Sequence, residues 1–332
     1  MTDVPVIEVS VVIATKLRPQ LLRNCLGALL QQTLAKQRYE VIVVDDGRSE
    51  ATRAVVAELA AQAAPHGPAL RYLQPGMTQG PAGARNTGWR ASRAPVIAFT
   101  DDDTLPEPAW LAEGLKALAA DHGMPVVAAA GQVVVPVGER PTDHARMTQG
   151  LERAEFATAN AFVRRTALQQ VGGFDERFTR AWREDSDLHF SLLALGAVVL
   201  APAARVVHPV RRVRWGVSLW QQANVQFDAL LYKKHRRLFR ERIRRRPPWL
   251  YVAIGAATLA APVALAADAP QAAAACGIAA LAGIGLFAAR RLRGASLHPS
   301  HVAEMLVTSV AIPYLALFWR FVGAWRYRVA YL

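Results

Sequence analysis

The chain has only two cysteines in its 332 residues, Cys25 and Cys276. Two thiols cannot build a disulfide framework or a thiolate metal site, so we expect both to be packing residues. The glycine-rich fingerprints GxGxxG and GxxxxGK followed by Ser or Thr are also missing, which argues against NAD-dependent enzymes and P-loop NTPases. Residues 1–5 lack a basic region and a long apolar core, so we expect no secretory signal and a catalytic part in the cytoplasm.

Positive charge is unevenly distributed along the chain. The formal net charge is +13, and segment 233–246 alone contributes +8, from nine Lys or Arg against the single acid Glu241. Residues 247–332 add +4, from six Arg and two acids, so residues 1–232 are almost neutral. Because the charge lies beside apolar segments and not on the first domain, we expect anionic membrane lipids as a partner and no nucleic acid.

Two long uncharged segments follow the basic cluster. Residues 249–267 and 269–289 are each long enough, or nearly so, to cross a hydrocarbon core of about 30 Å as helices. Arginines on both outer flanks predict a membrane hairpin with both ends in the cytoplasm, although two soluble alanine-rich helices are the alternative. A third apolar segment, about 303–319, is predicted as a short or interfacial helix.

The first hundred residues alternate between strand and helix patterns. Apolar, β-branched runs predict strands, and runs with one apolar face predict helices between them. The expected strands are 8–14, 39–44, 69–73 and 95–100, and the expected helices are 20–31, 51–63 and 82–91. Such alternation predicts a parallel sheet with right-handed crossovers, whose ligands gather at the carboxyl ends of the strands.

Three consecutive acids, Asp101, Asp102 and Asp103, end the fourth expected strand. Crowded carboxylates repel one another, and a divalent cation such as Mg²⁺ or Mn²⁺ shared with a diphosphate relieves that repulsion. The alternative is an N-cap for a helix expected from Leu105 to Ala120. One aspartate would suffice for a cap, so we favour a site for a metal and a diphosphate.

The ends of the other strands are polar too. Thr15 ends the first strand, and Asp45 and Asp46 end the second. A glycine-rich segment, 80–88, leads into a helix and carries Arg85, which could face a diphosphate together with free backbone amides. An alternative for Asp46 is a turn with the following glycine, and this can coexist with binding.

Read in order, these motifs resemble the family 2 glycosyltransferases, whose nucleotide-sugar-binding domain is called GT-A. The resemblance covers about residues 6–210. The matching segments are 11–15 (VVIAT), 41–47 (VIVVDDG), 83–88 (GARNTG), 99–103 (FTDDD), 172–176 (GGFDE) and 183–187 (REDSD). The resemblance implies an α/β protein with a Rossmann-like GT-A domain at 1–232. From the charge and the apolar segments described above, we expect a basic juxtamembrane segment at 233–248 and membrane-associated helices at 249–332.

The resemblance also implies roles at the donor site. Asp103 would bind the metal, and Asp101 would contact the metal or the ribose, while Asp102 lies between them and is expected to point away from the metal although it belongs to the donor site. Thr15, Asp45, Asp46 and Arg85 would contact the nucleotide or its phosphates. His208 follows a predicted strand and is a candidate third metal ligand, with a structural histidine as the alternative.

For catalysis, the resemblance implies an inverting, metal-dependent transferase with a nucleotide-diphosphate sugar as donor. Asp185, at the start of a helix expected over 185–195, is the candidate base, and Glu184 and Trp182 would lie on the acceptor side. Acids at a helix N-terminus can instead simply stabilise that helix. Downstream, Arg214 and Trp215 match part of the Gln-x-x-Arg-Trp motif of processive members, but the Gln is missing, which favours single-sugar transfer.

The basic cluster and the hairpin would hold this domain at the inner face of the cytoplasmic membrane, which favours a lipid-linked or cell-envelope glycan acceptor. Two other functions stay open on the sequence. A sugar nucleotidyltransferase also uses an α/β sheet and metal carboxylates, but usually has a glycine-rich loop after its first strand that is missing here. A membrane scaffold with a degenerate transferase domain is the non-catalytic alternative.

Overall fold

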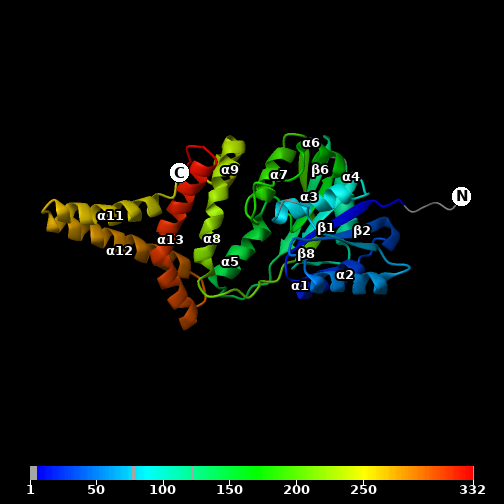
Figure 1. Ribbon diagram of the computed structural model, residues 1–332, viewed down its shortest axis with the longest axis horizontal. Coiled ribbons are helices and arrows are strands. Elements are labelled where there is room, and N and C mark those ends of the chain that lie inside the picture. The colour runs from blue at the N-terminus through cyan, green and yellow to red at the C-terminus, as the bar shows by residue number, and fades with distance from the viewer. Residues whose placement is uncertain (1–5, 77–78, 121–122, 332) are drawn as a thin grey trace. The chain divides into compact units, whose positions relative to one another are not determined.

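The computed structural model describes residues 6–76, 79–120 and 123–331, so the segment examined for a secretory signal lies outside the described residues. The chain forms two compact units (Figure 1). The first consists of Met1–Pro136 and Gln149–Val210, and the second of Val137–Thr148 and Arg211–Leu332. Each unit is built from two separate stretches of chain.

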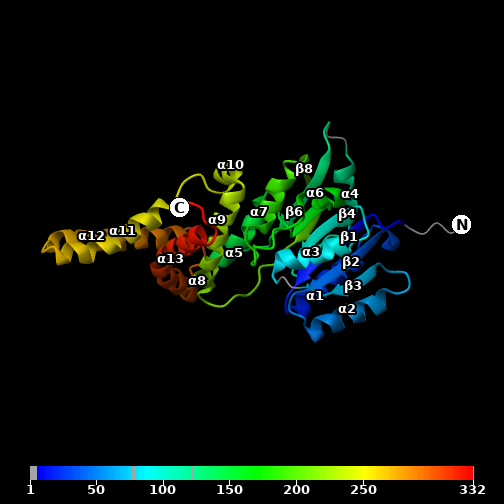
Figure 2. The same ribbon diagram turned by 45° about the horizontal axis from the view of Figure 1, so that its top comes forward.

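The first unit is built on a sheet of eight strands in the order β3-β2-β1-β4-β7-β6-β8-β5. Its first half, β3 (Ala69–Leu73), β2 (Tyr39–Asp45), β1 (Val9–Thr15) and β4 (Val96–Asp101), is parallel throughout, as the sequence predicted (Figure 2). Residues of β1 and β2 are almost all buried, which explains their continuous apolar, β-branched composition.

Helix α3 (Pro81–Ala91) lies very close to this half of the sheet. A Cβ atom at Gly88 would lie 2.4 Å from Val12 Cγ1 of β1 and 3.2 Å from Val44 Cγ2 of β2. Only glycine lets the helix approach so closely. The close packing fixes the helix that carries Arg85 against the central strand.

The second half of the sheet is mixed. Strand β7 (Asn160–Arg164) is antiparallel to β4 and to β6 (Val126–Val134), and β6 is parallel to β8 (Ala197–Val207). The helix expected from Leu105 begins only at Trp110, because Leu105–Pro106 forms the short strand β5, antiparallel to β8. Prolines at 106 and 108 delay the helix, because the residue before a proline is disfavoured in the helical conformation.

Three further helices of the first unit agree with the sequence patterns to within a few residues: α1 (Pro19–Leu30), α2 (Glu50–Ala63) and α7 (Glu184–Leu192). Helix α4 (Trp110–Ala119) ends where it was expected to, and α6 (Arg165–Val171) was not expected. Short 3₁₀ turns lie at Lys36–Arg38 and Gly150–Arg153.

The second unit is helical. It contains α5 (Asp143–Gln149), and residues 217–243 form several short helical pieces in place of one long helix. These are α8 (Val217–Gln221), η3 (Gln222–Val225), α9 (Gln226–Lys234), α10 (Arg236–Leu238) and a π-helical turn at Phe239–Ile243. They precede three long helices: α11 (Trp249–Ala266), α12 (Pro270–Leu292) and α13 (Pro299–Arg326).

All three long helices are long and apolar enough to cross a membrane. The bounds of α11 and α12 match, to within a few residues, those expected for the two helices of the hairpin. The third has 28 residues and is therefore much longer than the segment predicted from the sequence.

Candidate active site

The site lies where the strand order of the sheet reverses. From β1 the chain proceeds through β2 to β3 on one side and then returns to β4 on the other, so that Ala14 and Asp101 are neighbours in the parallel register. Open α/β sheets bind ligands at this point, beyond the carboxyl ends of the strands. Thr15, Asp45 and Asp101 are the last residues of β1, β2 and β4, and Asp102 and Asp103 follow directly.

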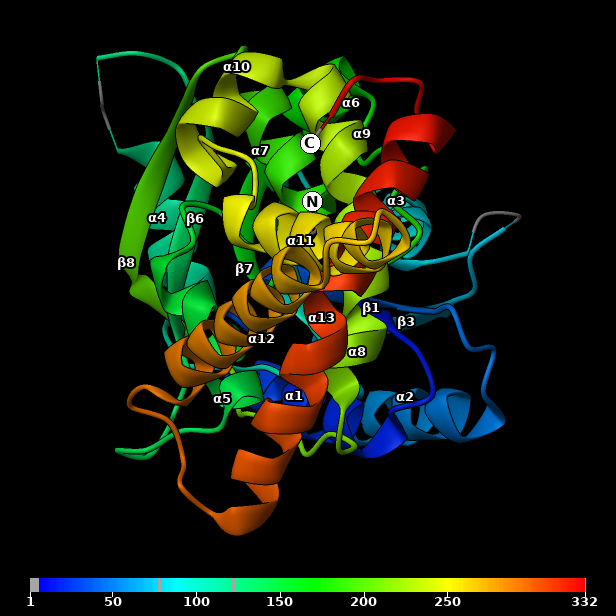
Figure 3. The ribbon, with the colours of Figure 1, turned by 90° about the vertical axis from the view of Figure 1, so that its left-hand side faces the viewer.

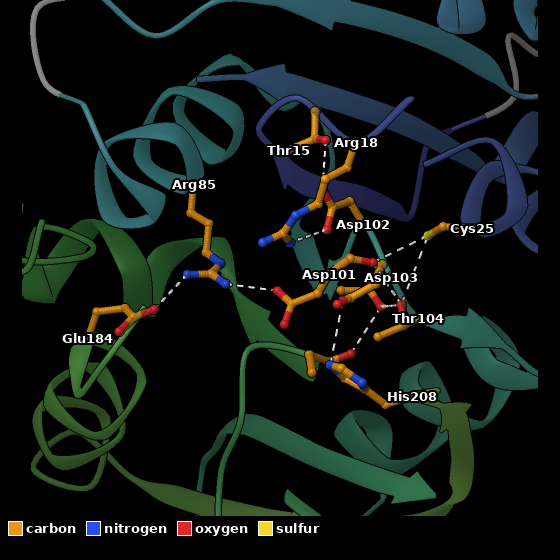
Figure 4. Close-up of polar contacts among 12 residues, drawn as sticks. Thr15, Arg18, Cys25, Arg85, Asp101, Asp102, Asp103, Thr104, Glu184 and His208 are labelled. Carbon is orange, nitrogen blue, oxygen red and sulfur yellow. Dashed lines mark hydrogen bonds and ion pairs between the residues drawn. The ribbon is translucent and has the colours of Figure 1, made fainter. Parts of the chain in front are cut away.

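Asp101, Asp103 and His208 come together in space. One possible ligand atom from each lies within 4.8 Å of the others, and His208 Nε2 is 3.5 Å from Asp103 Oδ1 (Figure 4). Strand β8 carries His208 just past its end, where the backbone amide donates to the Val134 carbonyl at 2.8 Å. Strand β5, directly after the acids, pairs with the end of β8 and so brings the two segments together.

Asp102 is directed away from this cluster (Figure 4). Its two oxygens accept hydrogen bonds from Thr15 Oγ1 at 2.7 Å and from Arg18 Nη1 at 3.0 Å. Burial raises the pKa of Asp102, and the Arg18 guanidinium opposes that shift. The middle acid therefore connects the acidic run to the end of β1, and it points away from Asp101, Asp103 and His208, as expected from the sequence.

Arg85 joins the acidic run to the start of α7. Its guanidinium donates to Asp101 Oδ1 at 2.8 Å and to Glu184 Oε1 at 3.0 Å, and it lies 5.8 Å from the centre of the Phe174 ring (Figure 4). Both Arg85 and Glu184 are buried. Burial and the neighbouring Asp185 charge raise the pKa of Glu184 to about 7, while Arg85 opposes the shift.

Asp185 lies beside Glu184 in the first turn of α7. Its Oδ1 accepts from the Ser186 backbone amide at 2.6 Å, and burial raises its pKa despite that bond. The preceding residue, Arg183, has φ of +76°, a left-handed conformation that a non-glycine residue rarely adopts, and its guanidinium lies 4.8 Å from the Trp182 ring centre. The two acids thus begin a helix at a strained turn, a feature common at functional sites.

Asp45 and Asp46 shape the end of β2. Asp45 is buried and accepts hydrogen bonds from the Gly47 and Ser49 amides at 2.9 and 2.7 Å and from the Tyr72 hydroxyl at 3.0 Å. Asp46 pairs with Lys16 at 2.9 Å and accepts from the Gly80 amide at 3.0 Å. The turn weighed for Asp46 and the following glycine is therefore present, with Asp45 accepting from the Gly47 amide, and Asp46 also connects the end of β2 to the start of α3.

Sequence reasoning missed several residues that build the site. Arg18 and Tyr72 were assigned no role. Asn86 was only part of a motif, yet its amide accepts from the Phe174 backbone amide at 2.9 Å and donates to the Phe174 carbonyl at 2.9 Å, which places that ring against Arg85. Its position next to Arg85 in the glycine-rich segment was the available signal.

The model of glycosyl transferase family 2 matches residues 10–178, and that of glycosyl transferase family group 2 matches residues 96–331. The chain belongs to glycosyltransferase family 2. It is thus a glycosyltransferase that uses a nucleotide-sugar donor, and this family membership favours the transferase over the nucleotidyltransferase and scaffold alternatives. The segment with the three acids and that with His208 both lie inside the second match.

Among curated proteins, the chain is 29% identical over 213 residues to glycosyltransferase AglE of Haloferax volcanii, covering 61% of this chain and 67% of the relative. It is also 29% identical over 244 residues to validoxylamine A glucosyltransferase of Streptomyces hygroscopicus subsp. limoneus, covering 63% of this chain. The chain spans about half the length of that second relative, 51%.

Among solved structures, the mannosyltransferase PcManGT from Pyrobaculum calidifontis, in complex with GDP-Man and Mn²⁺, is similar with a TM-score of 0.58 and 21% identity. The similarity covers 94% of this chain and 87% of that protein. The similarity shows that the chain described here has the GT-A fold, as the sequence motifs implied.

Proposed function

We propose that this chain is an inverting, metal-dependent glycosyltransferase that moves one sugar from a nucleotide diphosphate to a hydroxyl of a lipid-linked or cell-envelope glycan acceptor. The observation that carries the proposal is the cluster of Asp101, Asp103 and His208 at the strand ends, connected through Arg85 to Glu184 in the turn that begins α7. The cluster would hold the donor, and the turn would receive the acceptor.

The three candidate ligand side chains fit a divalent metal. Two carboxylates and one imidazole within 4.8 Å offer the oxygen and nitrogen ligands that Mn²⁺ accepts, and Mg²⁺ would rely on the carboxylates. Such an ion would neutralise charge on the departing diphosphate. PcManGT, whose structure contains Mn²⁺ and GDP-Man, has the same fold.

The chain's own groups would bind the rest of the donor. Asp46 at the end of β2 lies beside the residues expected to face the nucleotide, and Asp45 would hold the shape of that turn for it. Thr15 would act through Asp102, because its hydroxyl already donates there. Arg85 would place its cation near the phosphates while keeping Asp101 in position.

Asp185 would take the proton from the acceptor hydroxyl as it attacks the anomeric carbon from the face opposite the diphosphate. Burial raises its pKa from the ordinary aspartate value, which makes the carboxylate a stronger base. Glu184, fixed by Arg85, would keep the turn in place, and Trp182 would offer a ring to the acceptor. Since no Gln precedes Arg214 and Trp215 at the processive spacing, we expect a single transfer.

The apolar helices support a location at the inner face of the cytoplasmic membrane, with the catalytic unit in the cytoplasm. Helices α11 and α12 expose large apolar side chains, including Leu259, Val263, Ile278 and Leu281, as a hairpin in lipid would. Arginines lie in the last turn of α12 and directly after it, and nine cations lie in 233–246, where they would attract anionic lipids. A lipid-linked acceptor would then reach the site from the same membrane.

The test is a panel of UDP-, GDP- and dTDP-sugars with Mn²⁺ and membrane lipid extract, scored by nucleoside diphosphate release and by NMR of the product anomer. We expect one donor to react with inversion, and Asp185→Asn to lower turnover by about 10²- to 10⁴-fold with little change in donor KM. Glu184→Gln is the matched control, because it alters the neighbouring acid. Retention of configuration, or normal turnover of Asp185→Asn, would contradict the assignment.

A further inference from the structure

Helix α13 differs from the other two apolar helices in how much of it is buried. In its most apolar 18-residue window 33% of the residues are buried within the protein, against 6% in α11 and 11% in α12. Length and hydropathy alone would make it a third membrane span. Its contacts point to another position.

The two faces of α13 have different surroundings. One face carries large exposed apolar side chains at intervals of three, four or eight residues, which places them in one stripe along the helix. This outer stripe consists of Leu306, Val310, Phe318, Phe321 and Trp325, with Val307 beside it. The inner face is buried and contains Met305, Thr308, Ser309, Ile312, Ala316, Arg320 and Gly323.

The inner face packs on the segment of α8, η3 and α9, residues 217–234. The packing is close, since a Cβ at Gly323 would lie 2.4 Å from the Gln226 carbonyl oxygen. Nη2 of the buried Arg320 lies 4.0 Å from Oδ2 of Asp228 in α9. If α13 crossed the bilayer, this segment would have to accompany it.

Segment 217–234 is too polar to cross. It contains Gln221, Gln222, Asn224, Gln226, Asp228, Lys233 and Lys234. A charged side chain at the centre of a bilayer is costly, and segments that cross contain few of them. The segment leads directly into the basic cluster, which is drawn to the cytoplasmic face.

Both ends of α13 are bound to groups expected at the cytoplasmic face. Near its start, Arg291, which follows the apolar part of α12, donates to Thr308 Oγ1 at 2.6 Å and to Ser309 Oγ at 3.1 Å. At its end, Lys233 of the basic cluster donates to the Tyr327 carbonyl at 2.8 Å. Arg326 donates to Gln226 Oε1 at 3.1 Å. A helix with both ends at one face does not cross.

The helix directions agree with this. In Figures 1 and 3, α13 runs across the α11/α12 hairpin and alongside α8 and α9. Figure 1 also shows the hairpin extending from the side of α13 that is opposite α9. If the hairpin stands along the membrane normal, α13 lies in the membrane plane, with its outer stripe facing the lipid.

We propose that only α11 and α12 cross the membrane, and that α13 lies flat in the interface of the cytoplasmic leaflet, its outer stripe against lipid and its inner face on 217–234. This inference rests on the membrane location given under the proposed function. The partner it assigns to the outer stripe is the lipid surface itself.

Single cysteines test the topology in the full chain, after Cys25 and Cys276 are replaced by alanine. Ala267→Cys at the hairpin tip, Ser300→Cys at the start of α13 and Ala330→Cys after its end are each treated with a membrane-impermeant maleimide, on intact and on permeabilised cells. We expect position 267 to label in intact cells, and positions 300 and 330 to label only after permeabilisation.

The possible failures are distinguishable. Labelling of position 330 in intact cells would overturn the flat α13 and leave the hairpin and the proposed location intact. Failure of position 267 to label from outside would overturn the crossing hairpin, and with it both the proposed location and the inference drawn from it.

Depth measurements give a second, independent test. Spin labels on cysteines at 306, 310, 318 and 325 of the outer stripe, in vesicles of phosphatidylcholine and phosphatidylglycerol, should show similar shallow depths. The matched control is a series at 274, 278, 281 and 285 of α12, whose depth should change steadily along the helix. A depth that changes in the same way along α13 would overturn the proposal.

Discussion

His208 Nε2 lies 3.5 Å from Asp103 Oδ1, although the two residues belong to different halves of the first unit's chain. The contact depends on β5, which turns the chain back from the acids to pair with the end of β8. Asp101 joins the same cluster within 4.8 Å. Four predictions about the first unit follow from these contacts and from those around Arg85 and Gly88.

Asp103→Asn should abolish measurable Mn²⁺ binding in the presence of a nucleoside diphosphate, because it removes a charged ligand from the cluster. Electron paramagnetic resonance of free Mn²⁺ measures this directly. Asp102→Asn is the matched control from the same acidic run. It should keep most of the Mn²⁺ affinity and lower the melting temperature, since its partners are Thr15 and Arg18. Equal loss in both variants would mean that Asp103 has no special role.

His208→Ala should weaken Mn²⁺ binding by roughly 10- to 100-fold, the range found when groups around metal sites are removed. The side chain is buried beside Asp103, so the variant also leaves that carboxylate without its imidazole neighbour. His66→Ala, at an exposed position, serves as the control. Titration of Mn²⁺ against donor turnover measures the effect, and an unchanged apparent affinity would remove His208 from the metal site.

Stability should depend on pH through Glu184. Its folded-state pKa is raised to about 7, so this group's contribution is fully present below its ordinary pKa and is lost as pH rises through about 7. The melting temperature of Glu184→Gln in detergent should therefore rise relative to that of the wild type as the pH increases from 5 to 8. A constant difference across that range would show that Glu184 does not titrate there.

Gly88→Ala should destabilise the protein, although alanine normally favours a helix over glycine by about 1 kcal/mol. The new methyl would meet Val12 Cγ1, and overpacking in a core costs roughly 1–3 kcal/mol. Placed in a Val12→Ala background, the same substitution should cost less, because the clashing methyl groups are gone. Melting temperatures of the four proteins measure this coupling, and additive effects would contradict the close contact.

The first four strands of the first unit, the helices between them and the acidic strand ends could be predicted because local pattern determines them. Apolar, β-branched runs such as 39–45 form buried strands wherever they occur, and the acids at 101–103 follow one of these runs directly. The start of α4 was wrong by five residues, because the helical pattern continues through the prolines at 106 and 108. A two-residue strand has no pattern of its own and forms only through its partner.

The sequence by itself determined the parallel half of the sheet, the glycosyltransferase motifs and the two apolar helices of the hairpin, since each depends on neighbours close in the chain. Only the tertiary structure decided which acids share a site, which cation joins Asp101 to Glu184, and which face of α13 is buried. Those outcomes depend on pairings between distant segments, such as β5 with β8 and 217–234 with α13, and hydropathy along one segment carries no information about its partner.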